Sequence, residues 1–202
     1  MKRTTIAAIA ALALSSAFVA CGGSGTTTGA GDTTAHTTAA TTPQDPVEAA
    51  IGRFLTHSVA PAYSPGEVTI PSITIIHVDK SDTASVRVLG DFWVFNYNVA
   101  GDTLKTVSGG SHPGMMHLRH DGQGYTVTAF DQVGDGASFM PTARKIFGAH
   151  YEAFMAVNAN DTTREATRAQ GIARYVQEHG LKVTMYQDYG WPAKELSLGA
   201  VR

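Results

Sequence analysis

Residues 22–45 determine where a folded domain can begin in this chain of 202 residues. They include nine Thr, five Gly and four Ala, and no aromatic residue, Leu, Ile or Val. Such a segment buries too little apolar surface to offset the conformational entropy that folding removes. We therefore expect a disordered, flexible tether over residues 21–44 and a single folded domain over residues 45–202.

A short apolar segment precedes this tether. Lys2 and Arg3 are followed by an apolar run, Ile6–Ala20, that only two serines interrupt. As a helix this run would extend about 22 Å, which is less than the ~30 Å of a hydrocarbon core. A positive start and a short apolar run are typical of a secretory signal peptide, which we predict over residues 1–20 in place of a transmembrane anchor.

The end of the apolar run indicates how this signal would be removed. Ordinary signal peptidase prefers small residues, and cleavage after Ala20 would place the bulky Phe18 at one of those positions. The sequence Phe18-Val19-Ala20-Cys21 instead resembles the lipobox of bacterial lipoproteins, where a large apolar residue and a small residue precede an obligatory Cys. The alternative is cleavage after Ala17, which would leave Cys21 as a free thiol.

The lipobox resemblance implies that Cys21 becomes the mature N-terminus, with diacylglycerol on its sulfur and an acyl chain such as palmitate on its nitrogen. Two or more chains anchor a protein stably, whereas one chain binds reversibly. Cys21 is also the only cysteine, which excludes an internal disulfide framework and a Cys-rich zinc module. We therefore expect an exported lipoprotein of the bacterial cell envelope, attached to a membrane by its N-terminal lipid, with the domain outside the cytoplasm.

The folded part opens with a clear helix signal. Asp45, Pro46 and Glu48 suit the N-cap, N1 and N3 positions of a helix. Apolar residues then recur at helical spacing until Pro61 indicates the end of the helix. These residues are Val47, Ile51, Phe54, Leu55 and Val59.

Four extended segments are predicted next, over residues 67–79, 83–99, 103–120 and 125–133. Pro71 indicates an edge strand or a bulge in the first segment, and Gly90 indicates a bulge or a close backbone approach in the second. The third is interrupted by a Gly-rich break and resumes as Met115–His120.

The rest of the chain has a helical period. An apolar stripe from Phe139 to Met155 predicts two helices, or one helix bent near Gly148. The capping box at residues 162–165 then predicts a helix that ends at Gly180, followed by a last strand. Arg164, Arg168 and Arg174 interleave with glutamates in this helix, so we interpret them as a solvated face.

This order predicts an α+β fold. We expect an N-terminal helix on a curved antiparallel sheet of four to five strands, plus C-terminal helices, with the helices on one face of the sheet. The layout of residues 45–135 resembles the cystatin-like and NTF2-like cone architecture. The whole chain is similar to small uncharacterised bacterial lipoproteins that carry such envelope domains.

The segment from Ser108 to His120 has the most unusual composition. Five potential metal ligands occur in it: His112, Met115, Met116, His117 and His120. Imidazole suits zinc and copper, and thioethers favour cuprous copper. On a strand, however, His117 and His120 would point to opposite faces, because side-chain direction alternates. We therefore predict no metal site, and keep copper or zinc handling through residues 108–120 as a less favoured hypothesis.

A cone fold has an open end that some families use as a pocket with an acid–base carboxylate and a tyrosine. Asp91, Asp131, Tyr97 and Tyr125 lie on segments that could line such a pocket, but their spacing selects no pair. No nucleophile or zinc-protease motif occurs in the chain. We therefore assign no catalytic residue and no cofactor.

The aromatic residues near the C-terminus have two interpretations. Tyr186, Tyr189 and Trp191 could form a docking patch, or they could belong to a tail strapped over the sheet. We favour the strapped tail.

The 15 basic and 17 acidic residues give no basic excess, so we expect no nucleic-acid partner. With an anchor, a tether and no catalytic constellation, the leading hypothesis is a non-enzymatic binding or protein-interaction module with an envelope protein as its partner and no assigned ligand. The alternative is a small-molecule pocket protein or an enzyme on the cone fold.

Overall fold

The computed structural model describes residues 45–82 and 84–198. The predicted signal peptide, Cys21 and the predicted tether lie outside these residues. Helix α1 (Pro46–Phe54) begins where the sequence predicts, because the Asp45 carboxylate accepts a hydrogen bond of 2.7 Å from the Val47 amide. A π turn (Leu55–Val59) and a 3-10 turn (Ala60–Ala62) continue it. Within the described ranges, no helix has both the length and the apolar character needed to cross a bilayer.

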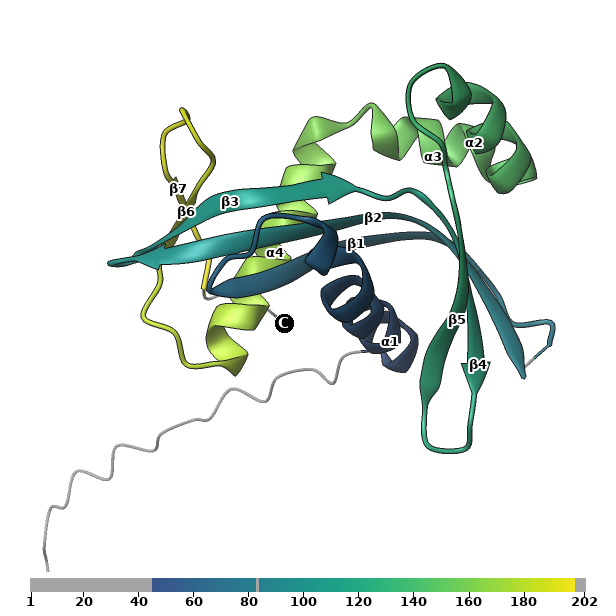
Figure 1. Cartoon of the computed structure of the whole chain (residues 1–202), viewed down its shortest axis with the longest axis horizontal. Helices are drawn as coiled ribbons and strands as arrows, with labels where there is room; N and C mark the ends of the chain where they lie inside the picture. The colour runs from purple at the N-terminus through teal and green to yellow at the C-terminus, as the bar shows by residue number, and fades with distance from the viewer. Residues whose placement is uncertain (1–44, 83, 199–202) are drawn as a thin grey trace, which may run out of the picture. The chain divides into compact units, whose positions relative to one another are not determined.

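One mixed sheet organises the domain (Figure 1). Its longest strand, β2 (Ser85–Ala100), pairs along one side with β1 (Val68–Asp79). On its other side, β4 (Gly114–His120) pairs with the first half of β2, and β3 (Thr103–Ser111) pairs with the second half. Strand β5 (Tyr125–Gln132) continues the sheet beyond β4.

The expected strand count and the expected purely antiparallel pairing are both wrong. The described part of the chain forms a sheet of seven strands, because β6 (Met185–Gln187) and β7 (Lys194–Glu195) extend it beyond β3. Strand β6 runs parallel to β3. Strand β6 is the last strand that the sequence predicts after Gly180. The additional strands are β4, which is separate from β3 where one interrupted segment was expected, and β7, whose two residues are too short to produce a visible period in the sequence.

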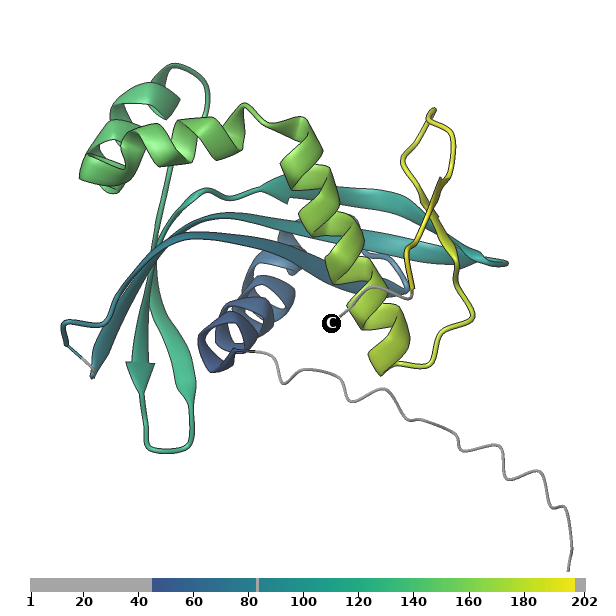
Figure 2. The same ribbon diagram turned by 180° about the vertical axis from the view of Figure 1, so that it is seen from behind.

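The sheet carries helices on both faces, which corrects the expectation that they cover one face. Successive side chains of β2 point to opposite sides, so Val88 packs with α1, whereas Leu89 packs with α2 (Phe139–Phe147) and α3 (Tyr151–Asn158). On the same face as Leu89, Tyr97 packs with α4 (Asp161–Glu178). Figures 1 and 2 show α1 and α4 on opposite sides of the strands.

Two glycines act as the sequence predicts. The chain turns between α2 and α3 at Gly148, whose φ is 50°. At Gly90 the β2 backbone lies so close to its neighbours that a Cβ would be 2.8 Å from the Thr74 oxygen. The capping box is placed wrongly, because Asn160 is the N-cap of α4 and accepts a 3.0 Å hydrogen bond from the Thr163 amide.

Candidate functional site

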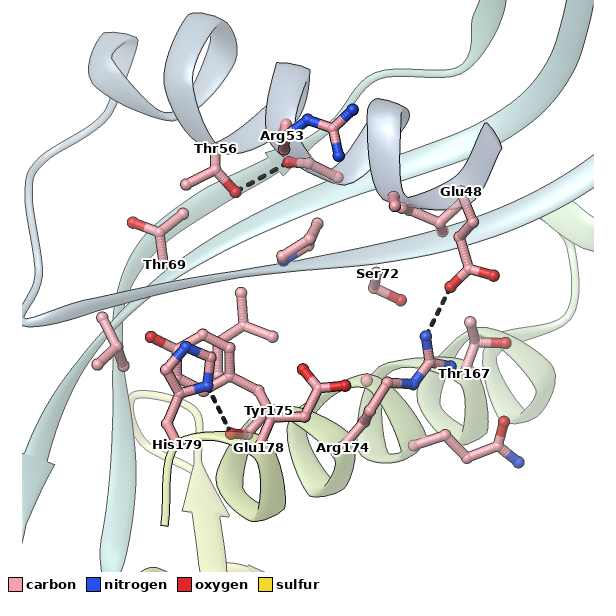
Figure 3. A pocket seen from close by; sticks show the side chains of 18 of the residues that line it. Glu48, Arg53, Thr56, Thr69, Ser72, Thr167, Arg174, Tyr175, Glu178 and His179 are labelled. Carbon is pink, nitrogen blue, oxygen red and sulfur yellow. Dashed lines mark hydrogen bonds and ion pairs between the residues drawn. The ribbon is translucent and has the colours of Figure 1, made fainter. Parts of the chain in front are cut away.

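A groove with a volume of about 840 Å³ runs between α1 and α4, with β1 between the two helices (Figure 3). Helix α1 borders it on one side and contributes Glu48 and Arg53, and the π turn that follows contributes Thr56. Helix α4 and its C-cap residue border the other side with a longer row of side chains: Thr167, Gln170, Arg174, Tyr175, Glu178 and His179. The groove therefore brings together distant segments, since Glu48 and Arg174 are 126 positions apart in the sequence.

The free edge of β1 lies in this groove. Strand β1 pairs with β2 along one edge, and no described residue pairs with its other edge. An edge strand presents alternating amide and carbonyl groups that can bond to another extended segment. Residues 67–75 all line the groove, and Ile75 is 37% exposed. Pro71 lies in the middle of this stretch and lacks a main-chain donor.

Two glycines allow both helices to approach β1 closely. An ideal Cβ on Gly52 of α1 would lie 3.7 Å from the Pro71 ring and 3.8 Å from the Ile73 side chain. A Cβ on Gly171 of α4 would lie 3.2 Å from the Pro71 carbonyl oxygen. A Cβ at Gly52 would therefore make ordinary contacts with β1, whereas a Cβ at Gly171 would press on the main chain of β1.

The groove carries both signs of charge. Arg174 donates a 2.8 Å hydrogen bond to Glu48 and so joins α4 to α1 across the groove (Figure 3). Both side chains of this ion pair are about 30% exposed, so solvent screens it only in part. Towards the C-terminal end of α4, the Tyr175 and His179 rings stack with their centroids 3.8 Å apart. The lining is polar and apolar in similar measure, with a half-buried tyrosine ring and an exposed histidine ring at one end.

A second, smaller cavity of about 360 Å³ lies between α4 and β2. Trp93 and Phe95 form its wall, with their ring centroids 5.7 Å apart. The Arg168 guanidinium lies 3.9 Å from the Phe95 centroid, and the Arg164 guanidinium lies 5.6 Å from the Trp93 centroid. Each of the two half-buried rings therefore has a guanidinium of the protein itself near one of its faces.

Arg168 is the centre of a hydrogen-bond network in this region. It donates to both Asp188 carboxylate oxygens at 2.8 Å, to the Tyr97 hydroxyl at 2.9 Å and to Thr106 at 2.8 Å. The interpretation of the α4 arginines as a solvated face is therefore wrong, since Arg168 is buried and Arg174 is paired with Glu48. The sequence holds a signal for Arg168, because it shares a helical face with Ile172 and Val176.

Burial and hydrogen bonding shift the pKa values of three groups near this network. Burial raises the pKa of Asp91, although Trp93 Nε1 donates to its carboxylate at 3.1 Å. Burial also raises the pKa of Tyr97 to about 12. The hydrogen bonds from Arg168 hold the pKa of Asp188 below its ordinary value.

The four residues considered for an acid–base pocket do not share one site. Asp91 and Tyr97 are buried on the face that carries α2, α3 and α4. Tyr125 packs with the core on the α1 side, and Asp131 accepts a 2.8 Å hydrogen bond from His117 at the surface. The structure brings together no pair of these residues.

The ligand candidates in residues 108–120 are also dispersed. The His112 ring meets the Tyr63 hydroxyl at 2.9 Å, and the His120 ring packs against Tyr125. Met116 is buried in the core beside α1, whereas Met115 packs on the opposite face. Across residues 45–82 and 84–198, no group of three His, Cys, Asp or Glu side chains is placed to hold a metal ion.

The C-terminal aromatic residues divide between the two interpretations. Tyr186 is buried against the sheet, as the strapped tail predicts. Tyr189 and Trp191 are exposed in the turn between β6 and β7.

Comparison of the chain with family models, curated proteins and solved structures found no match.

Proposed function

We propose that this protein is a lipid-anchored module of the bacterial cell envelope that binds an extended segment of a partner protein in the groove between α1 and α4. The observation that carries this proposal is the unpaired edge of β1 inside a groove bordered by two helices. The module acts by binding, and its partner is another envelope protein.

Strand addition supplies the affinity. An extended peptide that lies beside β1 gains main-chain hydrogen bonds, while its side chains contact the helices on either side. The groove follows β1 from Val68 to Ile75, a length of about 25 Å at ~3.3 Å per residue. Because Pro71 offers no donor, the added strand bonds in two short runs, one on each side of it. The bound segment is therefore short.

The side chains of the groove select the partner. Arg174 and Glu48 offer a cation and an anion on facing helices, each partly exposed. A segment that carries an acidic and a basic residue near its middle can exchange partners with this ion pair. Such complementarity favours specificity and association rate more than affinity.

The proposed anchor holds this module at a membrane. The lipobox residues up to Cys21 support lipidation, and the segment over residues 22–44 supports a tether. At ~5–6 Å times the square root of its length, this tether would have a root-mean-square span of about 25–30 Å, so the domain could lie against the lipid or away from it. The long β1–β2 pair with α1 on one face is consistent with a cystatin-like or NTF2-like arrangement, which we retain as part of the proposal.

Peptide selection on the purified full-length protein tests the groove. A phage-displayed library of random peptides is selected on the protein, and hydrogen exchange is measured with a selected peptide bound. We expect slower exchange of amides between residues 68 and 75. Gln170→Trp, which fills the groove from α4, should abolish binding. Gln123→Trp, in the turn between β4 and β5, should not.

Two results would refute the proposal that the groove binds an extended peptide. The library could yield no peptide that binds specifically, or the selected peptides could bind Gln170→Trp as tightly as the unmodified protein. N-methylated peptides provide a further criterion. Methylation of alternate amides should weaken binding, since strand addition uses every second main-chain group of the peptide.

A further inference from the structure

The turn between β6 and β7 exposes two aromatic side chains. Tyr189 is 97% exposed and Trp191 is 69% exposed, the highest values among the exposed large hydrophobic residues of the described chain. The hairpin that carries them projects beyond β3 (Figures 1 and 2). Leaving such rings in water forgoes the free energy that their burial would supply, so their exposure indicates a contact surface.

The hairpin is held in a defined conformation. The Trp191 amide donates to the Asp188 carbonyl at 3.1 Å, and Gln187 Nε2 donates to the Trp191 carbonyl at 2.8 Å. Gly190 has a φ of 78°, which allows the tight turn between the two aromatic residues. Arg168 fixes the Asp188 side chain at the base of the turn. The rings are therefore presented by an ordered turn.

We infer that Tyr189 and Trp191 enter the headgroup region of the bilayer that carries the proposed lipid anchor. This inference rests on the anchoring part of the proposed function. Indole and phenol rings combine an apolar body with a polar N–H or O–H group, and they are enriched where hydrocarbon meets water. The exposed rings of Tyr189 and Trp191 are of these two kinds, so they are suited to the headgroup region of a bilayer.

Charge and reach are both compatible with this contact. Arg168 compensates the carboxylate of Asp188, so the turn does not present this anion unpaired to a negative lipid surface. Residues 22–44 can extend roughly 75 Å at ~3.3 Å per residue. A domain of this length has a radius of gyration of only about 15 Å. The tether is therefore long enough for the hairpin to reach the membrane, and it also raises the local lipid concentration.

The two tryptophans of the chain allow a matched test. Lipidated full-length Trp93→Phe, with Trp191 as its single tryptophan, is reconstituted into vesicles of phosphatidylcholine and phosphatidylglycerol. We expect Trp191 emission to shift to shorter wavelength and to be quenched most strongly by lipids with a nitroxide near the headgroup. Trp191→Phe leaves only Trp93, whose emission should not respond to these lipids. Tyr189→Ser added to Trp93→Phe should reduce the quenching of Trp191.

Vesicle flotation in the same samples reports the anchor separately. A protein that floats while Trp191 keeps its solvent-exposed emission would overturn the inference and leave the anchor in place. If the protein does not float, a Trp191 shift on adding vesicles still supports the inference, and an unchanged emission overturns it.

Two further measurements keep the result interpretable. If Trp93→Phe does not fold, the difference between the spectra of the unmodified protein and Trp191→Phe isolates the same signal. A shift that grows with protein concentration without vesicles would assign the surface to a second copy of this chain, and would overturn the lipid contact.

Discussion

At the scale of single residues, Gly52 and Gly171 control how closely α1 and α4 approach β1. Gly52→Ala should raise the free energy of unfolding by about 0.5–1 kcal/mol, because the new methyl group meets its neighbours at ordinary contact distances and an interior helical glycine is replaced. Gly171→Ala should gain less or lose stability, because its Cβ would lie 3.2 Å from the Pro71 oxygen. Urea unfolding of both variants measures the difference. Equal stabilisation would show that α4 can move away from β1 at no cost.

Asp91 makes a pH-dependent prediction. Burial raises the pKa of this carboxyl, so the folded protein binds its proton more tightly than the unfolded chain does. The contribution of Asp91 to stability is therefore present at pH values below the ordinary carboxyl pKa near 4, and is lost as the pH rises through the higher folded value. Asn does not titrate at this position.

We expect the free energy of unfolding of Asp91→Asn, relative to the unmodified protein, to rise between about pH 4 and pH 8. Urea unfolding at a series of pH values measures this difference. A constant difference across the series would contradict the prediction. A loss of stability that does not depend on pH, for example from losing the 3.4 Å hydrogen bond that Ser111 donates, would shift this difference by the same amount at every pH. It would not change how the difference varies with pH.

At the scale of elements, Arg168 links α4 to β2, β3 and the segment that follows β6. Asp188→Asn should lower the free energy of unfolding by about 2–3 kcal/mol, because it leaves the buried guanidinium with neutral hydrogen-bond partners only. The loss should stay below that of a fully buried pair, since the Asp188 side chain is 34% exposed. Chemical unfolding measures the effect.

Asp161→Asn is the matched control for this charge pair. Asp161 pairs with Arg164 on the same helix, but its side chain is 90% exposed, so the change should cost less than about 0.5 kcal/mol. Similar losses in the two variants would show that the Arg168 network does not hold these elements together.

The elements themselves were largely predictable from local patterns. The start of α1 follows from Asp45, and the helical run that α1 and the two turns after it form ends at Ala62, next to Pro61. A run of β-branched residues likewise predicts β1. The face that each helix covers was not predictable in this way. Successive side chains of β2 point to opposite faces of the sheet, and apolar residues occur on both faces. The sequence pattern therefore indicates that both faces are buried, but it does not say which face α1 or α4 covers.

The candidate groove was beyond local prediction for the same reason. Glu48 and Arg174 meet only because α1 and α4 border the same edge of β1. In the sequence each is an ordinary charged residue on a helix. Arg168 was the exception, since an arginine in line with Ile172 and Val176 contradicts a purely solvated face.

At the scale of the whole molecule, the proposed lipidation of Cys21 makes a prediction about attachment. Cys21→Ser should abolish incorporation of an alkyne-labelled fatty acid in bacterial cells and release the protein from the membrane fraction, because under this proposal the thiol would be the acceptor of the first lipid. Labelling and cell fractionation measure this, and intact mass gives the mature N-terminus. If the unmodified protein takes up no label and begins at Phe18, it has been cleaved after Ala17, and that result would contradict lipidation.

The sequence by itself determined the start of the first helix at Pro46 and the α+β class of the fold. Those properties depend on composition and on periods along the chain, which are local. Only the tertiary structure decided that helices cover both faces of the sheet, that β6 returns parallel to β3, and that the edge of β1 lies in a groove. These features depend on contacts between distant segments, whose free energy comes from packing that no single segment encodes.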